Sequence, residues 1–210
     1  KKEIFSSSWC FLGRADEIPD VGDFRTVESP VGPVIVVRDK SEKIRVFSNT
    51  CLHRGCRITK EENGKCRAFV CPYHGWSYNL DGRLISAKHM EGSDIFSPED
   101  HKLRELNSDV WAGFVFMNLD PDAMSLGEWL GDMPEVFRYH DVQNLRCVGK
   151  DVYTVKANWK IIIENAIEDY HTERVHKGSI GAVLGTRIKT AGQWQAIFVE
   201  SERRWALLKG

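Results

Sequence analysis

The chain has 210 residues, of which 42% are hydrophobic and 28% are charged. Both values are ordinary for a globular protein, and this length accommodates one large domain or two modest ones. The 29 lysines and arginines nearly balance the 30 aspartates and glutamates. Because this balance produces no global field, binding to nucleic acid or to an anionic membrane is disfavoured.

No apolar run approaches the roughly 20 residues that a membrane-spanning helix needs. The first eight residues include no apolar stretch of the kind that a signal peptide carries. Six cysteines are present, and without a secretory signal they favour metal ligation over a disulfide framework. We therefore expect a cytoplasmic protein that neither spans a membrane nor binds nucleic acid.

The first half of the chain has the pattern of an antiparallel β-domain. Residues 1–30 predict a short helix followed by a loop, because Pro19 and Pro30 interrupt regular elements. β-branched and aromatic runs then predict strands at residues 34–37, 44–47, 68–70 and 111–119. Tight turns are predicted at Asn63-Gly64 and Asp81-Gly82. Many short strands joined by turns indicate a small sandwich or barrel.

The second half of the chain mixes helices and strands. The pattern predicts a linker at residues 120–122, a helix at 125–140, a strand at 151–156, a helix from 158 to about 176 and a strand at 194–200. Pro134 would interrupt the first of these helices.

Two short segments carry the residues of a metal site. Cys51 and His53 stand in the first segment, and Cys71 and His74 stand in the second. Two cysteines and two histidines also suit zinc, but zinc modules usually keep like ligands together in each segment. A cluster with two Cys on one iron and two His on the other needs loops that each supply one thiolate and one imidazole. The mixed arrangement therefore favours an iron–sulfur cluster.

At these residues the chain resembles the Rieske family, and its flanks resemble Rieske oxygenases. The resemblance lies in Cys-x-His-Arg-Gly, Cys-Pro-Tyr-His-Gly-Trp-x-Tyr and Asp-Gly-x-Leu, which begin at Cys51, Cys71 and Asp81. It implies a 2Fe–2S cluster in which Cys51 and Cys71 hold one iron and His53 and His74 hold the other.

The respiratory class of Rieske protein is the alternative, and it adds a disulfide between the two loops. Cys56 matches the first half of that bridge, but Tyr73 stands at the position of its partner. Trp76 replaces a serine that donates a hydrogen bond to the respiratory cluster, which implies a lower reduction potential. Cys56 and Cys66 are therefore expected to be unligated.

Residues 158–176 carry a second candidate site. Glu164, Glu168 and His171 are spaced so that they share one face of a helix. The packing face is expected to come from Trp159, Ile163, Ala166, Ile167 and Tyr170. Taken alone, a histidine near acids is more typical of a salt-bridged helix surface.

This segment also resembles the iron-binding helix of Rieske oxygenases, from Asn158-Trp-Lys to His176. The resemblance implies that His171 and His176 are two ligands of a mononuclear Fe(II) held by two histidines and one carboxylate. It also implies that Glu168 bridges His171 to the cluster ligand His74 of an adjacent subunit. Asp169 is the rival for that role, but as a helix residue it is more typical of a solvated surface acid.

The spacing of the two histidines imposes a geometric condition. Side chains at i and i+5 point about 140° apart on an ideal α-helix. We therefore predict a π-type bulge or a break between His171 and His176. The third ligand of the family, an acid on a later helix, has no counterpart in this chain, since Glu200 and Glu202 lie in a strand-like context.

The predicted fold is α+β, a Rieske antiparallel β-domain followed by the first part of a helix-grip catalytic domain. Three divisions are expected: an N-terminal segment at residues 1–34 that packs with the catalytic domain, the 2Fe–2S domain at 35–118 and the partial mononuclear-iron domain at 119–210.

By the same resemblance, the activity is reductive activation of O₂ for hydroxylation, dihydroxylation or demethylation of a small organic substrate. An aromatic substrate, in the breakdown of aromatic compounds, is the first expectation, and a quaternary amine is the second. NAD(P)H would supply electrons through a separate reductase or ferredoxin, which fits the lack of a Gly-x-Gly-x-x-Gly fingerprint. The implied assembly is a homotrimer, or a hetero-hexamer with a small subunit.

Two other functions compete with this one. The first is an electron-transfer Rieske protein without oxygenase activity, and the second is a helix-grip module whose second site is empty. Iron content separates them, because the oxygenase needs three irons per intact chain and both competitors need two.

Overall fold

The computed structural model describes residues 2–90, 92–179, 185–187, 190–191, 194 and 197–198. The chain divides into two compact units. The first unit comprises Lys1–Trp129 with Tyr139–Gly149, and the second comprises Leu130–Arg138 with Lys150–Gly210. We describe each unit by itself.

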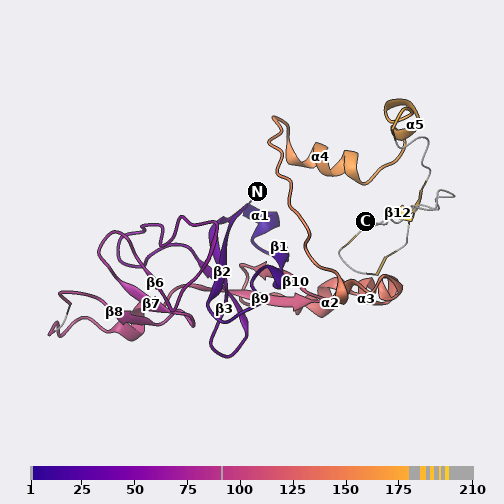
Figure 1. Cartoon of the computed structure of the whole chain (residues 1–210). Coiled ribbons are helices and arrows are strands. Elements are labelled where there is room, and N and C mark those ends of the chain that lie inside the picture. The colour runs from indigo at the N-terminus through magenta and orange to yellow at the C-terminus, as the bar shows by residue number, and fades with distance from the viewer. Residues whose placement is uncertain are drawn as a thin grey trace. The chain divides into compact units, whose positions relative to one another are not determined.

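The first unit is built from two antiparallel sheets (Figure 1). In spatial order, the seven-stranded sheet contains β1 (Cys10–Arg14), β10 (Phe114–Asn118), β9 (Glu105–Trp111), β4 (Ile44–Ser48), β3 (Gly32–Arg38), β2 (Asp23–Ser29) and β5 (Asn63–Lys65). The three-stranded sheet contains β6 (Ala68–Val70), β7 (Ser77–Asn79) and β8 (Leu84–Ser86). Short helices are α1 (Lys2–Phe5), η1 (Ala15–Glu17) and η2 (Pro98–His101). The predicted antiparallel β-domain is confirmed.

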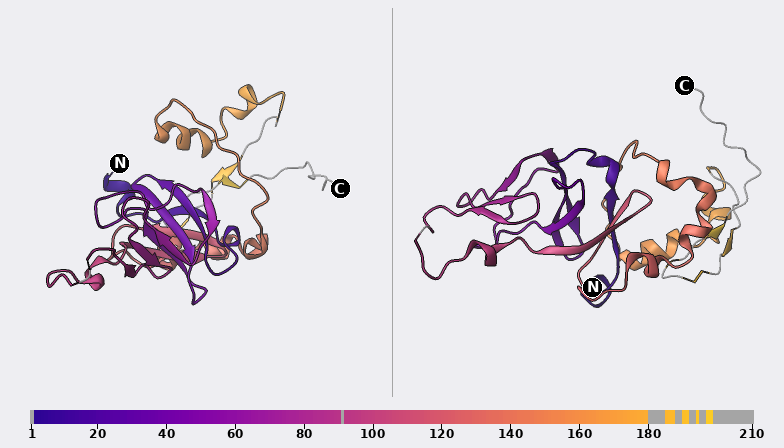
Figure 2. Two further views of the ribbon diagram at one scale, coloured as in Figure 1. Left: turned by 60° about the vertical axis from the view of Figure 1, so that its left-hand side comes forward. Right: turned by 90° about the horizontal axis from the view of Figure 1, so that it is seen from below.

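Strand β3 lies at the centre of this unit and is buried on both faces. Val34 and Val36 point into one hydrophobic core, and Ile35 and Val37 point into the other. This follows from the alternation of side chains along a strand. The core around Ile35 and Val37 also contains Cys51 and Cys71, so the candidate metal loops rest on the best-buried part of the sheet. Figure 2 shows the two sheets from two further sides.

Several sequence predictions for this unit were wrong in detail. Residues 1–30 contain strands β1 and β2, where a loop was expected, because charged side chains such as Arg25 hide the alternation of β2. Asn63-Gly64 lies within strand β5 and does not form a turn. The apolar run at 111–119 is the β9–β10 hairpin, turned by Ala112 and Gly113, whose φ angles are +47° and +83°. Two residues with positive φ are what a tight hairpin turn requires.

The segment from 139 to 149 is fastened to the first unit by one buried arginine. The Arg14 guanidinium donates to the carbonyl oxygens of Leu145, at 2.6 Å, and Val142, at 3.4 Å. Its Nε donates to Asp16 at 2.8 Å, and the second Asp16 oxygen accepts from the Cys147 amide at 2.9 Å. Three polar contacts therefore fix this stretch, which includes the short helix η4 (Val142–Asn144), and the Arg14–Asp16 bond holds their partners in place.

The second unit is mainly helical, and α2 begins just before it. Its elements are α3 (Met133–Val136), α4 (Trp159–Ala166), α5 (Thr172–Val175), β11 (Thr186–Arg187) and β12 (Ile197–Phe198), while α2 (Leu126–Leu130) and η3 (Arg138–His140) each cross a boundary between the units along the chain. The helix predicted at 125–140 is broken at Gly131, whose φ is +57°, and Pro134 lies in the first turn of α3. Proline is tolerated there because the amides of a first turn have no helical partner.

Two further predictions for this unit were wrong. Residues 151–156 form no strand and are exposed. The helix predicted from 158 to 176 is divided into α4 and α5. Within the predicted strand 194–200, β12 is observed, whereas residues 195–196 and 199–200, including Glu200, lie outside the described residues, as does Glu202. No helix in the described part of the chain is long and apolar enough to cross a membrane.

Candidate metal centres

The first candidate loop, residues 51–56, folds as a compact turn. The Cys51 amide donates to the Cys56 carbonyl at 2.8 Å, and the Gly55 amide donates to the Cys51 carbonyl at 3.0 Å. An isolated bridge between Thr50 and Arg57 closes the base of the loop.

The second loop, residues 71–76, repeats this turn. The Cys71 amide donates to the Trp76 carbonyl at 2.8 Å, and the Gly75 amide donates to the Cys71 carbonyl at 3.0 Å. Gly75 and Gly55 have φ angles of +73° and +69°, a region that glycine enters without steric cost. The sequence therefore folds two separate segments into the same local structure.

The two loops bring their thiols and imidazoles together in two layers. Cys51 and Cys71 are each 2% exposed and lie in the same hydrophobic core. His53 and His74 lie on the exposed tips of the loops, with ring centroids 4.6 Å apart. His53 also stacks on the buried Trp76 ring, at 4.7 Å and 9°, which fixes the orientation of its imidazole.

A buried tyrosine contacts the first thiol. The Tyr78 hydroxyl lies 3.3 Å from Cys51 Sγ, and Tyr78 is fully buried. Burial raises the pKa of both groups, so in the absence of a metal both stay protonated. Tyr78 is part of the sequence motif that begins at Cys71, but the motif alone does not indicate a role for it. A tyrosine two residues after the tryptophan, on a strand whose alternate residues are buried, is the signal that could have indicated it.

The other two cysteines of this region are free and half-buried. Cys56 packs against the core that contains Cys51 and Cys71, and its thiol donates to the Arg57 carbonyl at 3.4 Å. Cys66 packs against the same core, and burial raises the pKa of its thiol to about 11. That neither is a ligand stays a prediction.

The second candidate site lies where α4 ends and α5 begins. Glu168 Oε1 contacts Nδ1 of His171, and its Oε2 accepts from the His171 amide at 3.3 Å. The contact with His171 lowers the pKa of the Glu168 carboxyl. Because Nδ1 is engaged, Nε2 is the nitrogen of His171 left to bind a metal.

His171 and His176 converge, with ring centroids 5.2 Å apart. The predicted bulge or break between them is wrong. One α-helical turn joins them, since the Val175 amide donates to the His171 carbonyl at 2.9 Å. The break lies earlier, between the end of α4 and His171. The rings meet because His171 caps the start of this single turn and His176 caps its end.

Asp169 was expected to be a solvated surface acid, but the structure gives it hydrogen-bond partners. Its carboxylate accepts from the Gly185 amide, and its carbonyl accepts from the Thr172 hydroxyl at 2.7 Å. The expected apolar packing of α4 is not observed among the described residues, since Ile163 is 51% and Tyr170 90% exposed. Glu164 is also exposed and does not join Glu168 and His171.

Two family patterns match this sequence. Residues 8–99 match the Rieske [2Fe-2S] domain, and residues 142–205 match the ring hydroxylating alpha subunit (catalytic domain). This chain belongs to the Rieske oxygenases.

Two curated Rieske oxygenases illustrate the likeness. The glycine betaine monooxygenase oxygenase subunit of Chromohalobacter salexigens is 34% identical over 87% of this chain and 41% of its own length. The 2-aminobenzenesulfonate 2,3-dioxygenase subunit alpha of an Alcaligenes species is 35% identical over 81% of this chain and 44% of its own. The chain thus spans less than half the length of these relatives.

A solved Rieske oxygenase shares the fold. The crystal structure of the quaternary ammonium Rieske monooxygenase CntA in complex with L-carnitine matches with a TM-score of 0.82 at 30% identity. That match covers 90% of this chain and 55% of the other.

The donor sets fit the 2Fe–2S cluster and the mononuclear iron of Rieske oxygenases. Two buried thiols lie below two exposed imidazoles, which suits two irons with unlike ligands. Among the described residues, no group of three His, Cys, Asp or Glu side chains is placed to hold an ion.

Proposed function

We propose that this chain is part of the catalytic subunit of an oxygenase that receives electrons from a reductase or ferredoxin supplied by NAD(P)H. Cys51, Cys71, His53 and His74 hold a 2Fe–2S cluster, and His171 and His176 hold a mononuclear Fe(II). When bound, the cluster passes single electrons and the mononuclear iron activates O₂. The observation that carries the proposal is the paired folding of the two mixed loops, with imidazoles 4.6 Å apart above two buried thiols.

The residues of the chain prepare these sites before any metal binds. The core excludes water from Cys51 and Cys71, while the exposed tips leave His53 and His74 open to a redox partner. Trp76 stacks beneath His53 and restricts its rotation. A ligand whose ring is already oriented loses less entropy when it binds its metal.

Glu168 orients the second site. It holds Nδ1 of His171 and thereby selects the nitrogen that faces the metal. We assign it the role of the acid that connects His171 of one subunit with His74 of the next. This role implies a head-to-tail ring, such as a homotrimer or a hetero-hexamer with a small subunit. We also propose a cytoplasmic location, where a donor supplied by NAD(P)H would be available.

The proposed domain division rests on the same ligands. Residues 35–118 contain both loops and form the cluster domain, residues 119–210 begin the catalytic domain, and residues 1–34 form the N-terminal segment. The first compact unit holds both loops, but it runs from Lys1 to Trp129 with Tyr139–Gly149 and so also includes β1 and β2 of the proposed N-terminal segment.

Metal analysis tests the proposal. The intact protein is expected to bind three irons and two sulfides, whereas an electron carrier or an empty second site would give two irons. His171→Ala should remove one iron and leave the cluster spectrum, and Cys71→Ser should remove the cluster. A colourless protein without a paramagnetic signal after reconstitution and reduction would disprove the proposal.

The substrate is a small organic molecule, with an aromatic ring as the first candidate and a quaternary amine as the second. The relatives support both classes, because the glycine betaine and 2-aminobenzenesulfonate enzymes are almost equally similar to this chain. Reactions with ¹⁸O₂ distinguish them, since dihydroxylation of a ring adds two labelled atoms and N-demethylation releases formaldehyde. A protein with three irons that converts neither class would refute both assignments.

A further inference from the structure

The turn that carries His171 and His176 is short and gains little from apolar burial. Its helix α5 has four residues, Thr172–Val175. Tyr170 and Val175 are 90% and 69% exposed. A single helical turn is unstable by itself, because fixing its backbone costs more entropy than its few hydrogen bonds return. Polar contacts must therefore hold the backbone from which the two imidazoles project.

Asp169 supplies polar contacts on two sides of this turn. Its carbonyl accepts from the Thr172 amide at 3.0 Å and from the Thr172 hydroxyl at 2.7 Å, which fixes the backbone just before α5. Its carboxylate accepts from the amide of Gly185, 16 positions further along the chain. Thr172 is 7% exposed, so water competes little for its hydroxyl. One residue thus joins the local turn to a distant segment.

The distant segment is the start of a paired strand. Gly185 directly precedes β11, which pairs with β12 through Thr186 with Phe198 and Arg187 with Ile197. The turn and both strands belong to the second unit. A bond to the end of a paired strand holds the turn against backbone that is itself fixed.

We propose that Asp169 is a positioning residue of the mononuclear iron site. Its carbonyl and carboxylate fix the backbone on which His171 and His176 converge, while the neighbouring Glu168 orients the ring of His171. The inference rests on the proposed function, because it takes these two histidines as iron ligands.

Loss of this tie should weaken the binding of Fe(II). Asp169→Ala keeps both imidazoles but removes the carboxylate that accepts from Gly185. Ligands that are no longer held in place lose more freedom when the metal binds. We expect the Fe(II) affinity to fall by roughly tenfold, in the range typical for residues that orient a metal ligand. The intact, cluster-loaded protein is stripped of mononuclear iron with a chelator and titrated with Fe(II), and its cluster absorbance should match that of the wild type.

Two variants separate positioning from stability. Asp132 ties another segment of the same unit, since its carboxylate accepts from the Ala191 amide at 3.0 Å and from the Trp194 indole at 3.1 Å. Asp132→Ala should lower the thermal stability but leave the Fe(II) affinity unchanged. Asp169→Asn keeps an oxygen that can accept from Gly185, so its affinity should stay within about twofold of the wild type. An equal loss of affinity in Asp132→Ala, or an Asp169→Asn variant no better than Asp169→Ala, overturns the inference.

The same bond can be removed from its other end. Gly185→Pro deletes the amide donor and leaves Asp169 in place, so the measurement remains available if Asp169→Ala does not fold. Two mutations that break one shared bond are not additive. The double variant should therefore bind Fe(II) about as weakly as either single variant. Losses that multiply would show that Asp169 does not act through Gly185, and would overturn the inference.

Hydrogen exchange of the metal-free protein separates this inference from the proposed function. The amides of Val175 and His176, which donate to carbonyls within the turn, should exchange several-fold faster in Asp169→Ala than in the wild type. Unchanged exchange, or wild-type Fe(II) affinity in Asp169→Ala, refutes the positioning role and leaves the proposed function intact. Faster exchange in a protein whose wild type never binds mononuclear Fe(II) refutes the proposed iron site, and with it the role of Asp169 there.

Discussion

Tyr78 presents its hydroxyl to the sulfur of Cys51 from a fully buried position, 3.3 Å away. Against a cluster-bound thiolate this hydroxyl is the donor, and a donor to sulfur stabilises the more negative, reduced cluster. Tyr78→Phe should therefore lower the reduction potential by tens of millivolts, since roughly 60 mV corresponds to 1.4 kcal/mol for one electron. Voltammetry of the loaded protein measures this shift.

Tyr73→Phe is the matched control. Tyr73 packs against His74 at 4.0 Å but is 57% exposed, and among the described contacts its hydroxyl meets no thiol. Its loss should leave the potential nearly unchanged. Equal shifts in the two variants would show that the Tyr78 hydroxyl does not act on the cluster.

Asp39 is a buried carboxylate whose charge is balanced inside the first unit. Burial alone would raise its pKa, but a 2.5 Å contact with Arg45 and the amides of Ser41 and Lys43 hold that pKa below its usual value. Asp39→Asn should cost about 2 kcal/mol of unfolding free energy at pH 7, as is typical of hydrogen bonds to buried charges.

The sign of the pH dependence follows from the lowered pKa. Asp39 stabilises the fold fully above its unfolded pKa, near 4, and the contribution is lost as the pH falls through the lower folded value. The difference between wild type and Asp39→Asn should therefore shrink from pH 7 to pH 3 in urea unfolding. Asp81→Asn, which removes a contact to the exposed Arg83, should cost less than about 1 kcal/mol. A difference for Asp39 that grows in acid would contradict this account.

At the scale of the element, the β7–β8 turn depends on Gly82. Its φ is +84°, and a Cβ at this position would lie 2.6 Å from the fully buried Phe47 ring. Gly82→Ala should therefore combine backbone strain with overpacking and destabilise the unit by about 2–4 kcal/mol. Gly92 has a similar φ of +80° but open space around it, so Gly92→Ala should cost only about 1 kcal/mol. Thermal unfolding of both variants checks the difference, and equal losses would exclude the Phe47 contact as its cause.

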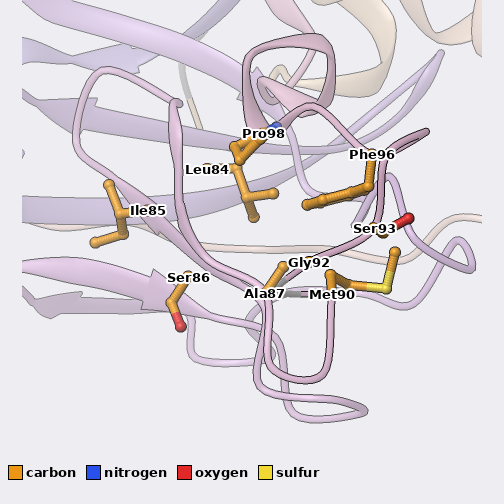
Figure 3. A pocket seen from close by; sticks show the side chains of 9 residues that line it. All are labelled: Leu84, Ile85, Ser86, Ala87, Met90, Gly92, Ser93, Phe96 and Pro98. Carbon is orange, nitrogen blue, oxygen red and sulfur yellow. The ribbon is translucent and has the colours of Figure 1, made fainter.

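A pocket lies beside this turn, where the loop that follows β8 covers one end of the first unit. It has a volume of about 450 Å³ and is lined by side chains of β8 and of the following loop, among them Leu84, Met90 and Phe96 (Figure 3). Phe96 also packs on Trp76, whose ring supports His53. The loop after β8 therefore supports the cluster site through two aromatic contacts.

The elements that the sequence predicted best are those whose burial pattern is simple. Strands β3, β4 and β6 have apolar runs that are evident in the sequence, whereas β1 and β2 carry arginines and a glutamate whose partners lie outside their own strand. Arg25, for example, is buried only because it pairs with Glu17. Such strands cannot be recognised from local polarity, since tertiary contacts satisfy their charges.

The sequence likewise predicted the parts of the site that depend on local motifs and missed those that depend on contacts between distant residues. Both loops follow from local motifs, because Gly55 and Gly75 supply the required backbone conformation. The bond from the Gly185 amide to Asp169 could not be predicted, because it joins residues 16 positions apart. The break in the helix before His171 was not predicted either, because the sequence pattern typical of a helix continues through it.

At the scale of the whole molecule, the proposed function places the cluster of one subunit against the mononuclear site of the next. Co-expression of two damaged subunits separates this arrangement from a relay within one chain. Cys71→Ser removes the cluster and keeps the iron ligands, while His171→Ala does the reverse. In a head-to-tail ring, a site works when its own subunit keeps the iron and its neighbour keeps the cluster.

Random mixing of equal amounts meets both conditions at about one site in four over all rings, and each mixed trimer has one such site in three, so isolated mixed trimers should retain about a third of wild-type product formation. A relay within one chain would leave no active site, because no subunit carries both metals. Each variant alone should be inactive in either case, which makes the mixture the informative sample. Two different affinity tags isolate the mixed rings, and product yield per ring then measures the result. Background activity in those rings, with the expected iron content present, would exclude transfer between subunits and with it the bridging role of Glu168.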